Sequence, residues 1–206
     1  MSSRVRRRYA TLMDSVPEAG YLVIDVEATC DDGPSVPKHE MEIIEIGAVL
    51  VDSVSLTTVA ELQTFIRPVR HPVLTAFCTR LTSISQSDVA GGRTFPAAIG
   101  ALCAFAREHA PNARPLFCSW GDYDRKQLEQ DAAYHGVKLS FGGRHVNLKK
   151  RFAERSGETK KLGMHEALAR VGLPLVGMHH RGIDDARNIA RLLPWVLGRE
   201  RFAGRE

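Results

Sequence analysis

The stretch YLVIDVEATC, residues 21 to 30, decides the fold of this chain. Aliphatic side chains dominate its start, as in a strand buried on both faces, yet it also carries Asp25 and Glu27. Alternate residues of a strand point to the same face, so these carboxylates are expected side by side, about 6 to 7 Å apart along the chain. Like charges held this close repel unless a cation lies between them. A single D-x-E also suits a strand that simply ends in a polar loop, so other carboxylates must decide.

Length and composition indicate one domain. The chain has 206 residues, of which 44% are hydrophobic and 25% charged, enough for a sizeable core. We expect a basic, flexible segment over 1–17 and a single domain over 18–206. No apolar run approaches the ~18 residues that span a bilayer, and no apolar stretch follows the basic N-terminus as it would in a secretory signal. The four cysteines form no C-x-x-C pair, so we expect reduced thiols, a cytoplasmic location and no membrane partner.

Net charge leans toward polyanionic partners. The formal charge is +4 with a pI of about 9.0, and basic residues cluster at 4–8, 149–151 and 160–161. Each cluster alone is more often a solvated surface, so the charge favours a nucleic-acid partner without establishing one.

The remaining pattern predicts a mixed sheet flanked by helices. A Gly/Pro loop leads from the first strand to a second at 42–52 and a third at 61–68, and the short connections suggest antiparallel pairing. Later segments alternate between strand and helix, which is typical of parallel pairing. They comprise helices at 72–80 and 95–109, a strand at 114–120, a helix at 122–136, a strand and short helix at 145–157, and helices at 161–171 and 183–197.

Further carboxylates stand at two predicted helix starts. Asp122 is expected to cap one helix, with Asp124 in its first turn, although both could serve only as caps. Asp184 is expected to cap the last helix, with Asp185 in its first turn beside an apolar stripe. His180 lies five residues before Asp185, so its imidazole can approach the same space.

The order D-x-E, D and H-x(4)-D resembles the DEDDh (DnaQ-like) family of 3′-to-5′ exonucleases, which have a ribonuclease H-like fold. The resemblance covers residues 21–197. Within the family, the sequence is most similar to the Eri-type exoribonucleases, and the segments that carry this similarity are 42–52 (EIIEIGAVLVD), 77–89 (FCTRLTSISQSDV) and 179–193 (HHRGIDDARNIARLL). Preferring Asp124 over Asp122, and His180 over His179, follows this resemblance. It implies an α/β, ribonuclease H-like sheet of five strands, three antiparallel and two parallel.

The chemistry explains the residue types. Acidic side chains suit hard divalent ions such as Mg²⁺ or Mn²⁺, and two ions about 4 Å apart stabilise both oxygens of a phosphoryl displacement. We expect Asp25, Glu27 and Asp185 on the ion that holds the attacking water, Asp25 shared with the second ion, and Asp124 acting largely through water. His180, with an ordinary pKa near 6.5, suits the general base. The products would be nucleoside 5′-monophosphates.

The resemblance also implies substrate contacts. The partner would be the 3′ end of nucleic acid, expected to be single-stranded RNA. The terminal nucleotide would face Glu27, the backbone of Ala28 and Thr29, and His180. Phe77 and Tyr123 would stack on bases, although each aromatic is a core residue by default. The basic residues Lys149, Lys150 and Arg151 would neutralise phosphates upstream of the terminus.

Three alternatives share much of this pattern. A DEDDh exonuclease acting on DNA would have the same five residues. An inactive nucleic-acid-binding module on the same fold would normally have lost one of them. A ribonuclease H-like endonuclease is disfavoured by the spacing of His180 and Asp185.

Overall fold

The computed structural model describes residues 19–203. The basic cluster at 4–8 and the expected flexible segment over 1–17 lie outside the described residues, so the division at residue 17 stays a prediction. Between residues 19 and 203, no helix has the length and apolarity needed to cross a membrane. The thiols of Cys30, Cys78, Cys103 and Cys118 are all free.

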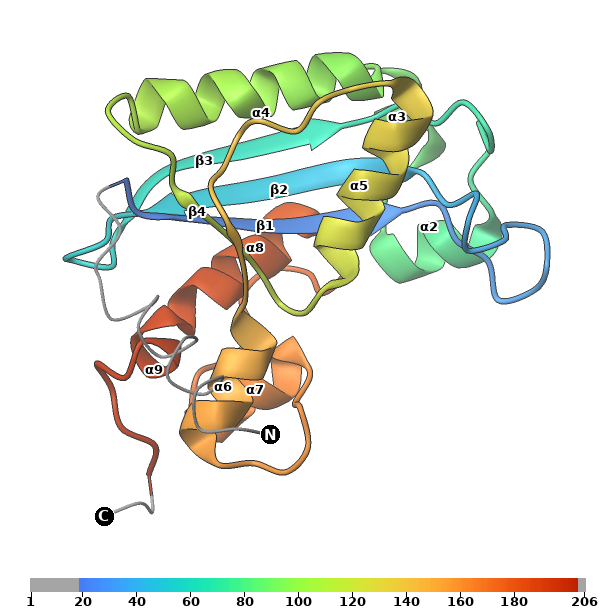
Figure 1. The fold of residues 1–206 in the computed structure, drawn as a ribbon. Helices are drawn as coiled ribbons and strands as arrows, with labels where there is room; N and C mark the ends of the chain where they lie inside the picture. The colour runs from blue at the N-terminus through green and yellow to red at the C-terminus, as the bar shows by residue number, and fades with distance from the viewer. Residues whose placement is uncertain (1–18, 204–206) are drawn as a thin grey trace, which may run out of the picture.

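A five-stranded mixed sheet forms the centre of the molecule (Figure 1). The strands are β1 (Tyr21–Ala28), β2 (Ile43–Val51), β3 (Thr58–Phe65), β4 (Leu116–Ser119) and β5 (His145–Asn147). Their order is β3-β2-β1-β4-β5. β1 pairs antiparallel with β2, and β2 pairs antiparallel with β3, whereas β4 and β5 run parallel to β1. The predicted ribonuclease H-like sheet is confirmed.

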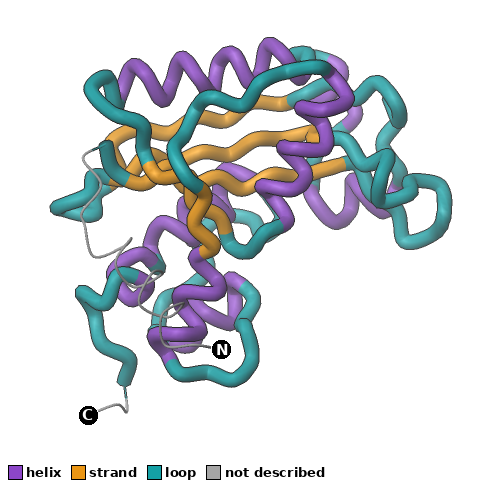
Figure 2. The backbone as a smooth tube through the Cα atoms, in the orientation of Figure 1, coloured by secondary structure: helices purple, strands orange, loops and turns teal. Residues whose placement is uncertain are grey.

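Helices cover both faces of this sheet (Figure 2). They are α2 (Ala76–Thr82), α3 (Gln86–Ala90), α4 (Phe95–His109), α5 (Tyr123–His135), α6 (Leu148–Ser156), α7 (Met164–Arg170), α8 (Gly182–Arg191) and α9 (Leu193–Val196). The prediction for 95–109 is confirmed to the residue, and α5 ends at Gly136 in the left-handed conformation, as expected.

The structure differs from the sequence prediction in several places. β3 spans Thr58–Phe65 rather than 61–68, and α3 was not predicted at all. The helices expected over 72–80 and 161–171 are α2 and α7, with the narrower or shifted bounds given above. The single helix expected over 183–197 is two helices, α8 and α9, which divide near Pro194. Proline has no N–H to donate to the preceding turn, so the hydrogen bonding of α8 does not continue through it.

The two faces of β1 pack against different helices. Leu22, Ile24 and Val26 belong to the core formed with α4 and α5. Tyr21 and Val23 belong to the core formed with α6, α7, α8 and α9. Because side chains alternate along a strand, Asp25 and Glu27 continue the Tyr21 and Val23 row and project on the α8 side.

Candidate active site

Three carboxylates meet where β1 ends against the start of α8. Asp25, Glu27 and Asp185 each offer an oxygen, and these atoms lie within 4.8 Å of one another. Glu27 and Asp185 are buried, and Asp25 is partly buried. The fold therefore brings the D-x-E pair of the first strand to the aspartate of the last motif, some 160 residues later.

Asp124 joins this cluster from α5. One of its carboxylate oxygens accepts the backbone N–H of Val26 at 3.1 Å, between the two acids of β1. Asp124 is 4% exposed, whereas the Asp122 side chain is 51% exposed and pairs only loosely with Arg125. Asp122 occupies the N-cap position of α5 but makes no side-chain capping bond, contrary to our expectation. Its backbone conformation is helical rather than the extended one that aims a cap at the N2 and N3 amides.

The acids of this cluster destabilise one another's charged forms. Burial, followed by the nearby carboxyls of Asp124 and Glu27, raises the pKa of Asp25 well above its ordinary value. Burial and the carboxyls of Asp185 and Glu45 raise the pKa of Glu27 to about 9. Burial raises the pKa of Asp124 to about 6, against the lowering effect of its bond from Val26. Burial also raises the pKa of Asp185.

These donors fit divalent cations. Within residues 19–203, no lysine or arginine forms an ion pair with Asp25, Glu27, Asp124 or Asp185, and among these four acids only Asp185 has a basic neighbour, His179 at 3.0 Å. Clustered carboxylate oxygens are the ligands that Mg²⁺ and Mn²⁺ prefer. A bound cation would also reverse the pKa shifts described above, because it favours the charged carboxylate.

The start of α8 differs from the prediction. Gly182 is its first residue and Arg181 its N-cap, so Asp184 is not a cap. The Asp184 carboxylate instead accepts the backbone N–H of Met178 at 3.0 Å and pairs with Arg187. It therefore ties the preceding loop to the helix, while Asp185 in the same turn points into the acid cluster.

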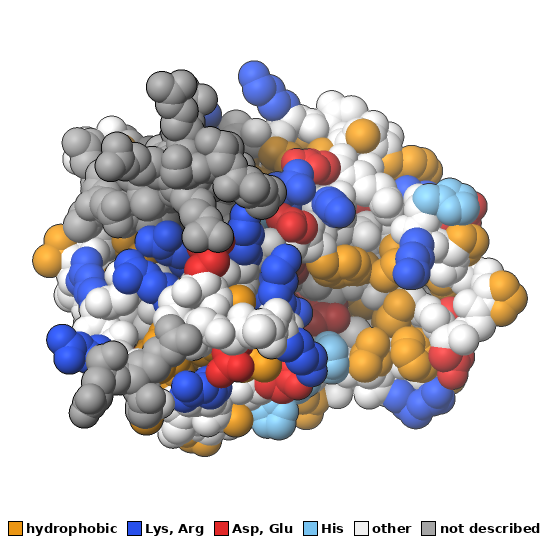
Figure 3. All heavy atoms as spheres, turned by 60° about the horizontal axis from the view of Figure 1, so that its bottom comes forward, with side chains coloured by type: hydrophobic (Ala, Val, Ile, Leu, Met, Phe, Trp, Pro, Cys, Tyr) orange, Lys and Arg blue, Asp and Glu red, His pale blue; other side chains and the backbone are white. Residues whose placement is uncertain are grey.

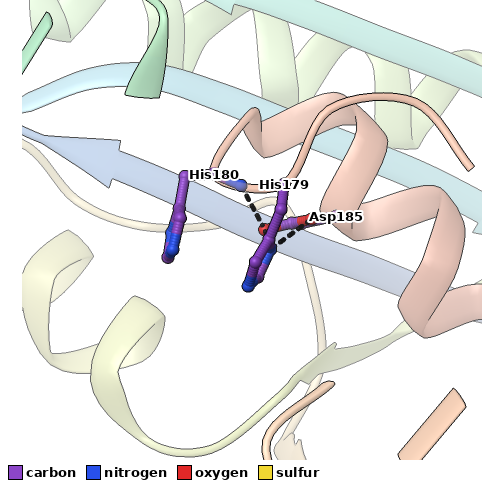
Figure 4. Close-up of side chains that lie close together, drawn as sticks. All are labelled: His179, His180 and Asp185. Carbon is purple, nitrogen blue, oxygen red and sulfur yellow. Dashed lines mark hydrogen bonds and ion pairs between the residues drawn. The ribbon is translucent and has the colours of Figure 1, made fainter. Parts of the chain in front are cut away.

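The ring of His179, rather than that of His180, is hydrogen-bonded to Asp185 (Figure 4). The His179 Nδ1 lies 3.0 and 3.2 Å from the two Asp185 oxygens. His180 reaches Asp185 through its backbone N–H, which donates at 3.0 Å. Its imidazole stacks on that of His179, with ring centroids 4.0 Å apart. A nitrogen of the His180 ring still lies within 4.8 Å of an Asp185 oxygen. The backbone of His180 has a φ of 63°, in the left-handed region.

The predicted nucleotide contacts surround the acid cluster unevenly. The Thr29 hydroxyl accepts the N–H of Glu42, and the Thr29 N–H donates to the Glu42 carbonyl. Both groups therefore already bond to the backbone of Glu42. Ala28 is buried at the end of β1. Phe77 is half-buried on α2. Tyr123 is 47% exposed, and burial together with the nearby Glu27 carboxyl raises the pKa of its hydroxyl, which places that group beside the cluster.

The predicted phosphate contacts lie on α6. Lys149, Lys150 and Arg151 follow directly after β5, which pairs with β4, the neighbour of β1. Strands are spaced about 4.8 Å apart, so the start of α6 is about 10 Å across the sheet from β1. Figure 3 shows acidic atoms recessed in a hollow beside histidine atoms, with Lys and Arg side chains along one side of it.

Sequence reasoning missed Glu45. This residue of β2 lies directly opposite Glu27 and is fully buried. A charged residue inside the apolar run IIEIG, residues 43 to 47, was the available signal, because buried glutamates are rare unless they are paired.

The strand order and the carboxylate cluster define a ribonuclease H-like protein with a candidate divalent-metal site. Comparison with known families agrees. Residues 22–193 match the RNase_T exonuclease family, and the chain belongs to it.

Two relatives and one structure show the range of similarity. The chain is 32% identical to human ERI1 exoribonuclease 3 over 178 residues, which is 84% of this chain and 52% of that protein. It is 30% identical to the probable 3′-5′ exonuclease KapD of Bacillus subtilis, over 85% of this chain and 83% of that one. It superposes with a TM-score of 0.79 on the nuclease domain of 3′hExo, a DEDDh family member bound to rAMP, at 27% identity over 87% of this chain and 92% of that domain. The chain spans about half the length of ERI1 exoribonuclease 3.

Proposed function

We propose that this protein is a 3′-to-5′ exonuclease that releases nucleoside 5′-monophosphates from single-stranded RNA. The observation that carries the proposal is the meeting of Asp25, Glu27 and Asp185 oxygens within 4.8 Å, in a chain of the RNase_T exonuclease family. Family membership supplies the reaction class, and the cluster supplies the ligands that this reaction needs.

The carboxylates would hold two divalent ions, Mg²⁺ or Mn²⁺. When bound, such ions neutralise the acids and stabilise both the attacking and the leaving oxygen of the phosphodiester. Asp25, Glu27 and Asp185 supply the clustered oxygens. Asp124 is held against β1 by its bond from Val26, which leaves one carboxylate oxygen free of that bond.

His180 is our candidate general base. It borders the cluster through its backbone bond to Asp185. Burial, with His179 beside it, lowers the pKa of His180 below its ordinary value, so the ring is neutral near pH 7 and a ring nitrogen can accept the proton of the attacking water. A nitrogen of its ring lies within 4.8 Å of an Asp185 oxygen, which supports this assignment.

Two observations favour RNA over DNA. The human relative is an exoribonuclease by name, and the 3′hExo nuclease domain was crystallised with rAMP, a ribonucleotide.

Tyr123 is our candidate for a base-stacking contact. It presents a half-exposed ring with its hydroxyl beside Glu27. A base stacked on that ring would place its phosphate near the acids, and such stacking tolerates any base.

The experiment that tests the function compares end-labelled oligonucleotides. With Mn²⁺ or Mg²⁺, a single-stranded RNA should lose one nucleotide at a time from its 3′ end and yield 5′-monophosphates, whereas a circular RNA of the same sequence should survive. Excess EDTA should stop cleavage while the circular dichroism spectrum stays that of the folded protein.

Other outcomes would support the alternatives. Faster turnover on the matched DNA would assign DNA ends as the substrate, and cutting of the circle would indicate an endonuclease. Tight binding without cleavage under any metal would favour an inactive binding module, and cleavage in excess EDTA would contradict the metal mechanism.

The basic residues of α6 give a separate prediction. Each phosphate neutralised on a single strand contributes about −0.7 to the slope of log affinity against log salt. The double variant Lys149→Ala with Lys150→Ala should therefore flatten that slope by about 1 to 1.5, measured by fluorescence anisotropy with a labelled RNA in Ca²⁺. Arg151 is left intact because its Nε is buried.

A matched control removes the same charge elsewhere. Arg107 and Lys138 are both exposed and lie outside α6. Replacing them with alanine should leave the slope unchanged. Equal slopes for the two double variants would remove α6 from the binding surface.

A further inference from the structure

Glu45 is a buried carboxylate that the proposed reaction does not use. It lies on β2 opposite Glu27, and its side chain has no exposed surface. Directly opposed residues of an antiparallel pair share a face, so Glu45 projects toward α8, as Glu27 does. An ionised carboxylate in such a position is costly unless it is paired and hydrogen-bonded.

Two of its three partners lie at the start of α8, and the third lies on the neighbouring strand β3. One carboxylate oxygen accepts the backbone N–H of Gly182 at 3.1 Å and the Arg181 Nε at 3.2 Å. The other accepts the Gln63 side-chain amide at 2.7 Å. The first N–H groups of a helix have no partner within the helix, and Arg181, the N-cap residue, provides no capping bond. Glu45, on strand β2, therefore caps the N-terminus of α8. Its negative charge suits that end of the helix dipole.

Two glycines make this contact possible. A Cβ at Gly47 would lie only 2.1 to 2.2 Å from backbone atoms of Gly182 and Ile183. A Cβ at Gly182 would lie 3.1 Å from the Asp25 carbonyl oxygen. The first turn of α8 thus lies directly on β1 and β2, within reach of a side chain that stands two residues before Gly47.

The segment that carries the candidate base is held at both of its ends. The His180 N–H donates to Asp185, and the Gly182 N–H donates to Glu45. Between them, His180 has a φ of 63°. A histidine adopts this conformation only when the surroundings hold it there. Without Glu45, the bond from the His180 N–H to Asp185 would remain as the one fixed end.

We propose that Glu45 is a positioning residue, which holds residues 180–182 so that His180 meets the acid cluster. This inference rests on the proposed function. Glu45 touches no reacting group in this assignment, and it acts through the backbone of Gly182 and the side chain of Arg181.

The test uses Glu45→Ala and Glu45→Gln, each in the wild-type and in the His180→Ala background. Glu45→Ala should lower kcat on the order of 100-fold, the scale of a misplaced catalytic group, and leave KM and the metal concentration for half activation nearly unchanged. In the His180→Ala background it should cause no further loss, because the group that Glu45 positions is gone. Glu45→Gln keeps the shape and one oxygen acceptor, so it should recover part of the rate.

Glu61→Ala is the matched control. Glu61 on β3 pairs with Arg187 on α8, so this variant also removes a strand-to-helix carboxylate pair, but at an exposed place away from residues 180–182. Its kcat should stay close to that of the wild type. Amide hydrogen exchange gives a readout independent of turnover, because the amides of residues 180 and 182 should exchange faster in both Glu45 variants and not in Glu61→Ala.

The outcomes separate the two proposals. An inactive wild-type protein with the predicted exchange pattern would reject the exonuclease function and retain the positioning contact. An active wild type whose kcat is insensitive to Glu45→Gln and Glu45→Ala would overturn the inference. Equal losses in the two backgrounds would also overturn it, since they would show a general structural effect, and a change confined to metal activation would assign Glu45 an electrostatic role instead.

Discussion

Asp185→Asn should reduce turnover on the order of 10⁴-fold or more while the protein stays folded. The asparagine keeps the shape of the side chain but removes one of three clustered carboxylates, and with it the charge that a divalent ion requires. Stability should change little, because burial raises the pKa of Asp185, so removing its charge relieves part of the cost of burying it. Single-turnover cleavage of a labelled RNA and thermal unfolding measure the two effects.

Asp184→Asn is the control for this variant. Asp184 bonds to Met178 and Arg187 outside the cluster. Losing one of these contacts should cost stability of about 1 kcal/mol and leave most of the activity. If Asp184→Asn were the inactive variant and Asp185→Asn the active one, the register of the last motif would be shifted by one residue.

Metal binding provides a second measurement on the same pair. Mn²⁺ should raise the Tm of wild type and of Asp184→Asn, and should raise that of Asp185→Asn much less.

The pH dependence of the free energy of unfolding follows from Glu27, whose pKa is raised from 4.5 to about 9. The folded, metal-free protein keeps that proton over this range while the unfolded chain releases it, so its stability falls as pH rises between these values. Protons compete with the ion, so stabilisation by Mn²⁺ should grow over the same range.

His180→Ala should lower kcat by about 10²- to 10⁴-fold and leave metal activation nearly intact, because a general base contributes that factor and the carboxylates remain. The wild-type rate should rise with pH as the imidazole becomes neutral. Since burial and His179 lower the pKa of His180, that rise should lie below the ordinary value of about 6.5. The variant should lose this rise. Water on a metal titrates in a similar range, so the two profiles must be compared.

His179→Ala is the decisive comparison. His179 bonds to Asp185 through its ring, so its loss removes one hydrogen bond to a proposed metal ligand and should reduce kcat far less than His180→Ala. The opposite ranking, with His179→Ala the damaging change, would make His179 the base and reject the H-x(4)-D assignment.

The fold was largely predictable because its signals are local. The aliphatic run of 21–24, the apolar positions of 95–109 and the Gly136 stop each act through near neighbours, and the structure confirms all three. The boundary of β3 and the break at Pro194 were missed for different reasons. Residues 58–60 are mostly exposed and give little apolar signal. Pro194, in contrast, was visible in the sequence, and its effect on helical hydrogen bonding outweighs the apolar periodicity that continues past it.

By itself, the sequence determined which acids are available and in what order. The alternation of a strand puts Asp25 and Glu27 on one face, and two helix starts carry Asp124 and Asp185, and both patterns are local. Only the tertiary structure decided how they meet. Asp124 is fixed by Val26, 98 residues away along the chain, and Gly182 is capped by Glu45, 137 residues away. It also placed the His179 ring, and not that of His180, on Asp185. Contacts at such separations depend on how the strands and helices pack, and periodicity within one segment carries no information about that.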